Sequence, residues 1–189
     1  MRFLLSLLAA MASSLVLGLG SAWYMIAAPR TGTIDVGTWQ ALPTIDASTA
    51  DPYVRARIAR SGEIGMGGGE GLVFVTGVDG RGDSLSATCD YRLSGRSPTA
   101  RLWTLTTEGE GRRPGLTPEG RAHLDNRNLL RDGDGRFLIT LSTRARPGNW
   151  LPAPAEGTYT LVLRLYDTPI ALASGQLPDL PVIEREACR

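Results

Sequence analysis

Apolar and polar residues alternate with a period of two in several short runs after residue 70, and each run is bounded by Gly, Asp, Ser or Pro. This pattern predicts strands within residues 71–78, 83–95 and 100–107. Two longer strands are predicted at 136–143 and 158–167, and a short final strand ends at Cys188. One face of each strand is apolar, which is typical of half-buried antiparallel sheets. The expected core-facing residues are Leu85, Ala87, Cys89, Tyr91, Leu93, Phe137, Ile139, Leu141, Tyr159, Leu161, Leu163 and Leu165.

Turn and helix signals separate these strands. Asp51 as N-cap, Pro52 at the first helical position and Gly62 just beyond the end predict one short helix over residues 53–60. A further short strand is expected at 34–39. Asp-Gly pairs predict turns within 79–83 and 132–135. The Gly-rich stretch 62–71 follows a helix and lacks the G-x-G-x-x-G spacing, so it is interpreted as a loop.

Residues 3–28 form an uncharged run that is longer than the roughly 20 residues needed to cross a bilayer. Arg2 precedes the run, and Trp23 and Tyr24 occupy its outer end as interfacial aromatic residues do. We expect an uncleaved signal anchor, with a signal peptide cleaved near residues 20–22 as the alternative. The predicted organisation is an anchor at 1–30, a linker at 31–50 and an exported β-sandwich at 51–189.

Composition excludes several classes of function. The formal net charge is +1, with both signs interspersed, so no nucleic-acid partner is indicated. The basic residues are all Arg, which excludes Schiff-base chemistry and a P-loop. His123, the one histidine, lies in a long irregular stretch at 107–137 and is expected at the surface. A zinc site or a Ser–His–Asp triad needs more than this single residue, and the sequence indicates no metal or cofactor.

The two cysteines, Cys89 and Cys188, are expected to pair in an oxidising compartment and to attach the C-terminal tail to the sheet. The alternative is two separate thiols, one of them buried as a small apolar side chain. Sequence alone leaves both open.

The order of several segments resembles short, membrane-anchored bacterial members of the domain-of-unknown-function family 1214. The matching segments run from residue 51 to residue 188: "DPYVRARIARSG", "EGLVFVTGVD", "CDYRLSG", "SPTARLWTLT", "RDGDGRFLITLS" and "GNWLPAP" with "LVLRLYD". The resemblance implies a jelly-roll-like antiparallel β-sandwich and a bacterial protein that faces the periplasm. It implies no activity.

Two functions are weighed. The first is a non-enzymatic envelope module that is held in the inner membrane by residues 3–28 and binds an envelope protein or glycan. The second is a hydrolase or lyase acting on a cell-wall or small polar substrate, for which Asp90 with Glu108, or Asp125 with Asp132, would supply the carboxylates. No motif brings either pair together, so we expect a binding or structural role and assign no catalytic residue.

Two regions are candidate ligand sites. On the outward face of the strand at 158–167, Arg164 and Tyr166 are expected near Arg101 and Trp103, a combination that suits anionic or sugar ligands. The alternative is that this face packs under the helix or the long loop. In the second region, the Pro-rich corner around Asn149 and Trp150, we expect Trp150 to plug one end of the sandwich and Asn149 to satisfy turn backbone. Ligand contact by these two residues is the alternative.

Overall fold

The computed structural model describes residues 2–27, 33–42, 51–61, 66–67, 69–116, 120, 122–170 and 177–189. The chain forms two compact units, which are described separately. One comprises Met1–Thr31 with Ile45–Gly65, and the other Gly32–Thr44 with Met66–Arg189. Half of the expected linker, at 31–32 and 43–50, and half of the Gly-rich stretch, at 62–65 and 68, lie outside the described residues.

The first unit contains the helices α1 (Arg2–Ala27) and α2 (Pro52–Ser61). An 18-residue window of helix α1 has a mean hydropathy of 2.1, and the helix is long enough to cross a membrane, which fits either a signal anchor or a signal peptide. At the start of α2, the N–H of Tyr53 donates to Oδ1 of Asp51 over 2.7 Å, so the predicted cap and helix are confirmed. The predicted stop at Gly62 lies outside the described residues.

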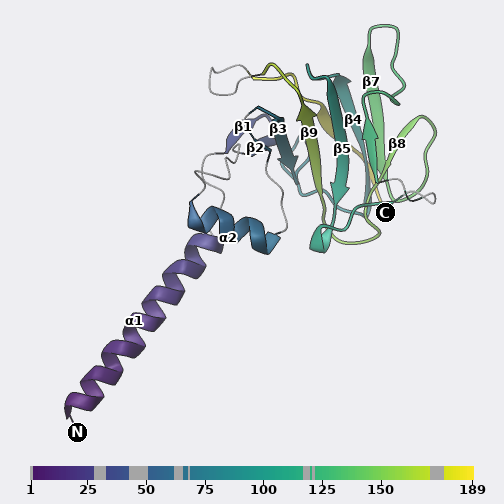
Figure 1. The fold of residues 1–189 in the computed structure, drawn as a ribbon. Coiled ribbons are helices and arrows are strands. Elements are labelled where there is room, and N and C mark those ends of the chain that lie inside the picture. Colours follow the sequence, from purple (N-terminus) through teal and green to yellow (C-terminus); the bar gives the residue numbers. More distant parts are fainter. Residues whose placement is uncertain are drawn as a thin grey trace. The chain divides into compact units, whose positions relative to one another are not determined.

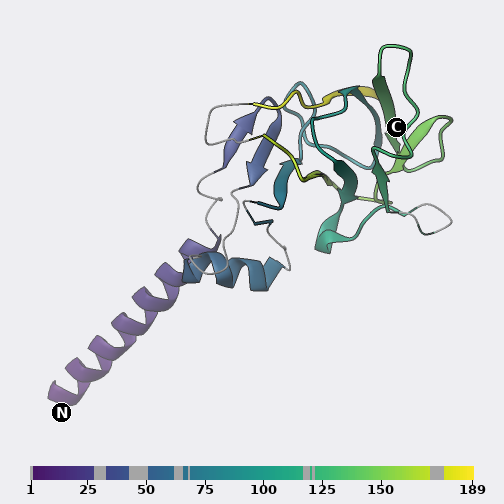
Figure 2. The ribbon, with the colours of Figure 1, turned by 45° about the horizontal axis from the view of Figure 1, so that its top comes forward.

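The second unit contains a six-stranded antiparallel sheet with the order β1-β2-β3-β9-β5-β6 (Figures 1 and 2). Its strands are β1 (Ile34–Val36), β2 (Trp39–Leu42), β3 (Gly71–Thr76), β9 (Thr160–Tyr166), β5 (Leu102–Glu108) and β6 (His123–Asp125). The expectation of one strand at 34–39 is wrong because the chain reverses at Gly37, which has a φ of 62°. A left-handed conformation of this kind suits a tight hairpin.

The other sheet has four strands in the order β10-β4-β7-β8. They are β10 (Val182–Cys188), β4 (Cys89–Arg96), β7 (Arg136–Ser142) and β8 (Asn149–Pro152). Strands β7 and β8 pair in parallel, so the expectation of an entirely antiparallel sandwich is wrong. Parallel neighbours usually need a long crossover. Here β8 begins opposite Ile139, only partway back along β7, and the loop at 143–148 covers that distance.

Both sheets contribute to a single core, as the alternating pattern predicted. All the expected core-facing residues are buried, from Leu85 to Leu93 in the first run and through Leu165 in the last. Tyr91 and Tyr159 meet edge to face, with ring centroids 6.3 Å apart. The Nε1–H of Trp39 donates to the carbonyl of Pro181 over 2.8 Å, which ties β2 to the segment before β10. The fold is thus mostly β, with two sheets.

The predicted turns are confirmed at both Asp-Gly sites. The amide N–H of Asp79 donates to Asp83 O over 2.9 Å, and that of Asp132 donates to Arg136 O over 2.9 Å. The stretch at 107–137 is less irregular than expected, since it holds a 3-10 turn at Glu110–Arg112 and the short strand β6. His123 is exposed, as predicted, although it lies on this edge strand.

Candidate functional site

The outward surface of the four-stranded sheet is here called the exterior face. Side chains alternate between the two faces along each strand, so those of the exterior face point away from the core, whereas the buried Leu93, Ile139 and Leu151 point into it. The register aligns them in three rows across the sheet. These rows are Arg96 with Arg136; Val182 with Ser94 and Leu138; and Glu184 with Arg92, Thr140 and Trp150.

A groove of about 430 Å³ lies on the exterior face. Its floor comprises Ser94, Leu138 and Thr140, so two hydroxyl groups flank one apolar side chain. Residues 130–132 and 147–149 line it as well, and Arg136 also contributes. The volume falls within the roughly 300–1,000 Å³ typical of small-molecule sites.

Hydrogen bonds between side chains and the backbone fix the segment at 130–136. Oδ1 of Asp132 accepts the N–H groups of Asp134 and Arg136, over 3.0 and 2.7 Å, and thereby closes the hairpin turn. The guanidinium of Arg131 donates to the carbonyl of Asn126 over 2.7 Å. The groove therefore has a wall that is formed before any ligand arrives.

Asn149 joins the two sides of the groove. Its Oδ1 accepts the N–H of Leu130 over 2.8 Å, and its Nδ2 donates to the carbonyls of Leu130 and Leu138 over 2.8 and 2.9 Å. The side-chain amide thus satisfies backbone groups, as expected. Its role at the groove is to hold the walls in place.

Trp150 does not plug the sandwich as predicted. It pairs with the outward-facing Thr140 and is half-buried on the exterior face, whereas the next residue, Leu151, is completely buried. The Nε1–H of Trp150 donates to Ser142 O over 3.0 Å. The prediction was wrong because β8 joins the sheet, so its alternation sends Leu151 inward and Trp150 outward.

The other predicted site residues lie on the six-stranded sheet or, for Arg101, directly before one of its strands. Arg164 and Tyr166 project from the outward face of β9, where Nη2 of Arg164 lies 3.4 Å from Oε1 of Glu108. Arg101 is largely exposed before β5, with Nε 3.2 Å from Oδ2 of Asp167. The expectation that Trp103 shares this face is wrong, because Trp103 is buried in the core and donates to Ser97 Oγ over 3.0 Å. The six predicted residues therefore fall on two sheets.

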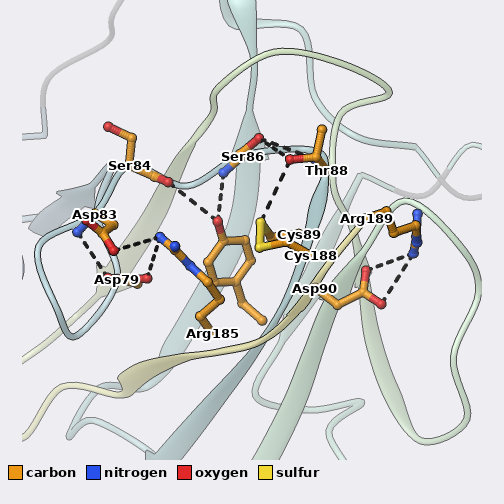
Figure 3. The surroundings of a disulfide bond; sticks show 11 residues. Asp79, Asp83, Ser84, Ser86, Thr88, Cys89, Asp90, Arg185, Cys188 and Arg189 are labelled. Carbon is orange, nitrogen blue, oxygen red and sulfur yellow. Dashed lines mark hydrogen bonds and ion pairs between the residues drawn. A yellow bond between two sulfur atoms is a disulfide. The ribbon is translucent and has the colours of Figure 1, made fainter.

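The disulfide Cys89–Cys188 closes a separation of 99 residues and joins β10 to the start of β4 (Figure 3). The pairing predicted from the sequence is thus formed. It indicates an extracytoplasmic domain, since structural disulfides persist mainly in oxidising compartments.

On one side of the disulfide, the buried Asp79 organises the turn before β4. Its Oδ1 accepts the N–H groups of Arg81 and Asp83 over 2.9 and 3.1 Å, and its Oδ2 lies 2.8 Å from Nη2 of Arg185 in β10 (Figure 3). Burial alone would raise the pKa of Asp79, but these donors and the nearby cation outweigh it and lower that pKa.

On the other side, the buried Asp90 accepts from three side chains. Ser142 Oγ donates to it over 2.8 Å, Arg189 lies 3.1 and 3.3 Å from its two oxygens, and Arg146 forms a close ion pair. Burial alone would raise the pKa of Asp90, but these partners together have the larger effect, so the pKa is lowered. The carboxylate is therefore a fixed structural anion.

The carboxylates that were candidates for catalysis each make separate local contacts. Asp125 accepts from the N–H groups of Arg127 and Asn128, Asp132 closes its turn, and Asp90 and Glu108 lie in different sheets. Within the described ranges there is no group of three or more His, Cys, Asp or Glu side chains placed to hold a metal ion.

Most of the groove could not be predicted from the sequence. Ser94, Leu138 and Thr140 were recognisable as outward-facing positions of strands, but nothing in the pattern distinguished them from ordinary solvated positions. The hairpin at 132–135 was predicted, yet its place beside residues 147–149 depends on the parallel pairing of β7 with β8.

Comparison with known proteins places residues 70–170 within the model of a family described as protein of unknown function, DUF1214. The structure is similar to that of the VPA0106 protein from Vibrio parahaemolyticus, with a TM-score of 0.56 and 24% identity over 74% of this chain and 36% of that one. An uncharacterized protein from Burkholderia cenocepacia matches with a TM-score of 0.49 and 22% identity over 90% of this chain and 41% of that one. The chain thus spans less than half the length of each. None of the curated proteins matches the sequence.

Proposed function

This chain belongs to the DUF1214 family of proteins of unknown function, and we propose that it is a non-enzymatic periplasmic domain that binds an envelope glycan in the groove of its exterior face. The observation that carries the proposal is the groove itself. Its floor combines the hydroxyls of Ser94 and Thr140 with the apolar side chain of Leu138, and its walls are fixed by Asp132 and Asn149. Hydroxyl and apolar groups side by side match the polar edge and apolar face of a sugar ring.

The size of the groove favours a glycan over a protein partner. A stable protein interface covers about 800 Å² on each partner. The exterior face instead offers a concave site of about 430 Å³ with convergent polar groups. An envelope protein remains the competing partner in the test below.

The placement of the domain is part of the proposal. Residues 3–28 would hold the chain in the bacterial inner membrane as a single-pass anchor, with the C-terminal domain in the periplasm. The apolar helix α1 and the disulfide support this arrangement. The jelly-roll topology implied by the family resemblance likewise stays a prediction.

The proposal is tested by blocking the floor of the groove. Full-length protein in detergent is titrated with fluorescent, solubilised peptidoglycan fragments. Ser94→Tyr places an aromatic side chain in the groove, while Thr104→Tyr makes a similar change on the outward face of β5 in the other sheet. We expect the parent and Thr104→Tyr to bind equally, and Ser94→Tyr to bind at least about tenfold more weakly.

Three kinds of outcome would overturn this assignment. Binding that is absent in the parent, or equal in all three proteins, removes the groove as a glycan site. A photoreactive residue at Leu138 that captures one envelope protein, without glycan binding, assigns the groove to a protein partner. Shortened or unsaturated fragments after incubation would instead favour the hydrolase or lyase.

A further inference from the structure

Arg96 and Arg136 are directly opposite each other in the antiparallel pairing of β4 with β7, and both point to the exterior face. Side chains at such positions have Cβ atoms about 4.5–5.5 Å apart, and like charges placed there repel. Both residues are exposed, so solvent screens part of this repulsion. The arrangement nevertheless concentrates two positive charges at one point of the sheet.

This pair differs from the other arginines of the same sheet. Nη2 of Arg92 lies 2.6 Å from Oε1 of Glu186, and Arg185 pairs with Asp79 and Asp83. By contrast, neither Arg96 nor Arg136 has an ion-pair partner among the described residues. Their donors are available for a ligand.

The pair adjoins the groove. Arg136 lines it directly, and the next row of the exterior face contains the floor residues Ser94 and Leu138. A ligand over Leu138 would therefore have its end beside both guanidinium groups. Each guanidinium presents a planar fork of N–H donors that fits the two oxygens of a carboxylate or phosphate.

Resting on the function proposed above, we infer that Arg96 and Arg136 form an anion subsite that makes the groove selective for acidic saccharides. The sugar ring lies over Leu138 and contacts the hydroxyls of Ser94 and Thr140. Its carboxylate or phosphate lies between the two guanidinium groups, where it also relieves their mutual repulsion.

The test compares saccharides that differ in charge. The neutral probe is the disaccharide of N-acetylglucosamine. The acidic probes are the disaccharide of N-acetylglucosamine with N-acetylmuramic acid, which carries a carboxylate, and the 1-phosphate of the neutral probe. Inorganic phosphate alone is the fourth ligand. Binding to full-length protein in detergent is measured by calorimetry at low and at physiological salt.

We expect the parent to bind at least one acidic disaccharide about tenfold or more tightly than the neutral one. Arg96→Gln and Arg136→Gln should each remove most of that preference, because each lowers affinity for the acidic disaccharide much more than affinity for the neutral one. Arg92→Gln is the matched control, because it removes the same charge from the same face but from an arginine already paired with Glu186. It should keep the preference. Arg136→Lys, which keeps the charge and loses the fork, should be intermediate.

Other results separate the subsite from the groove. Equal binding of neutral and acidic disaccharides by the parent, or a preference that survives in the double glutamine variant, overturns the anion subsite and leaves the glycan site standing. Inorganic phosphate that binds as tightly as the acidic disaccharides shows a bare anion site and overturns the saccharide selectivity. If no saccharide binds, both proposals fail. Thermal unfolding checks that each glutamine variant is at least as stable as the parent, as the loss of like-charge repulsion predicts.

Discussion

Arg189 donates to both carboxylate oxygens of Asp90, over 3.1 and 3.3 Å, from the position directly after the disulfide-bonded Cys188. Arg185, in β10, pairs with the buried Asp79 on the other side of the disulfide (Figure 3). Strand β10 and the residue after it are therefore attached to β4 and to the turn before β4 by the disulfide and by the ion pairs of Arg185, Glu186 and Arg189. Since β10 borders the exterior face, this attachment supports one edge of the face that holds the groove.

Removing the disulfide should weaken the attachment of β10. We expect the double variant Cys89→Ala, Cys188→Ala to lose about 2–4 kcal/mol in the free energy of unfolding, because its unfolded chain is freed from a closed loop of about 100 residues. Urea unfolding of the full chain measures the loss. Parent protein treated with reductant should match the variant, and equal stability of oxidised parent and variant would contradict the prediction.

Asp79 should contribute more to stability than its neighbour Asp83. Asp79→Asn keeps an Oδ1 that can accept the two backbone N–H groups but removes the buried negative charge that pairs with Arg185, so a loss of about 2 kcal/mol is expected. Asp83 also lies near Arg185, at 3.3 Å, but its side chain is 60% exposed. Asp83→Asn should therefore cost less than about 1 kcal/mol. Similar losses for the two variants, measured by thermal unfolding, would refute this ranking.

Asp90 should make folding sensitive to acid. Its pKa is lower in the folded protein than the ordinary value of 3.8, so the stabilisation is complete above pH 3.8 and is lost as the pH falls through the lower folded value. Asp90→Asn should be less stable than the parent at pH 7, and the difference should shrink below about pH 3.8. Urea unfolding at pH 7, 4 and 3 measures both proteins. A difference that stays constant over this range would exclude Asp90 as the source.

Leu151 and Trp150 allow a direct comparison of the two faces of β8. Leu151 is completely buried, so Leu151→Ala should cost about 2–5 kcal/mol. Trp150 is half-buried on the exterior face, so Trp150→Ala should cost less despite removing a larger side chain. Urea unfolding gives both values, and a larger loss for Trp150→Ala would restore its interpretation as the plug of the sandwich.

Local patterns determined much of this protein. Alternation with a period of two identified which residues of β4, β7 and β9 face the core, and Asp-Gly pairs identified the turns at 79–83 and 132–135. The cap formed by Asp51 with Pro52 located α2, and the length of the apolar run located α1. These features depend on neighbours within a few residues of the chain, so one sequence is enough to predict them.

Tertiary structure determined which distant segments of the chain lie side by side. The parallel pairing of β7 with β8 turned Trp150 outward and Leu151 inward, and it brought residues 147–149 beside the hairpin at 132–135. The alternation of β5 placed Trp103 in the core, away from Arg164 and Tyr166. The register of β4 with β7 set Arg96 opposite Arg136. Strand pairing and register depend on contacts between distant segments, and a shift of one residue reverses the face of every side chain, so the groove and its arginine pair emerge only once the chain is folded.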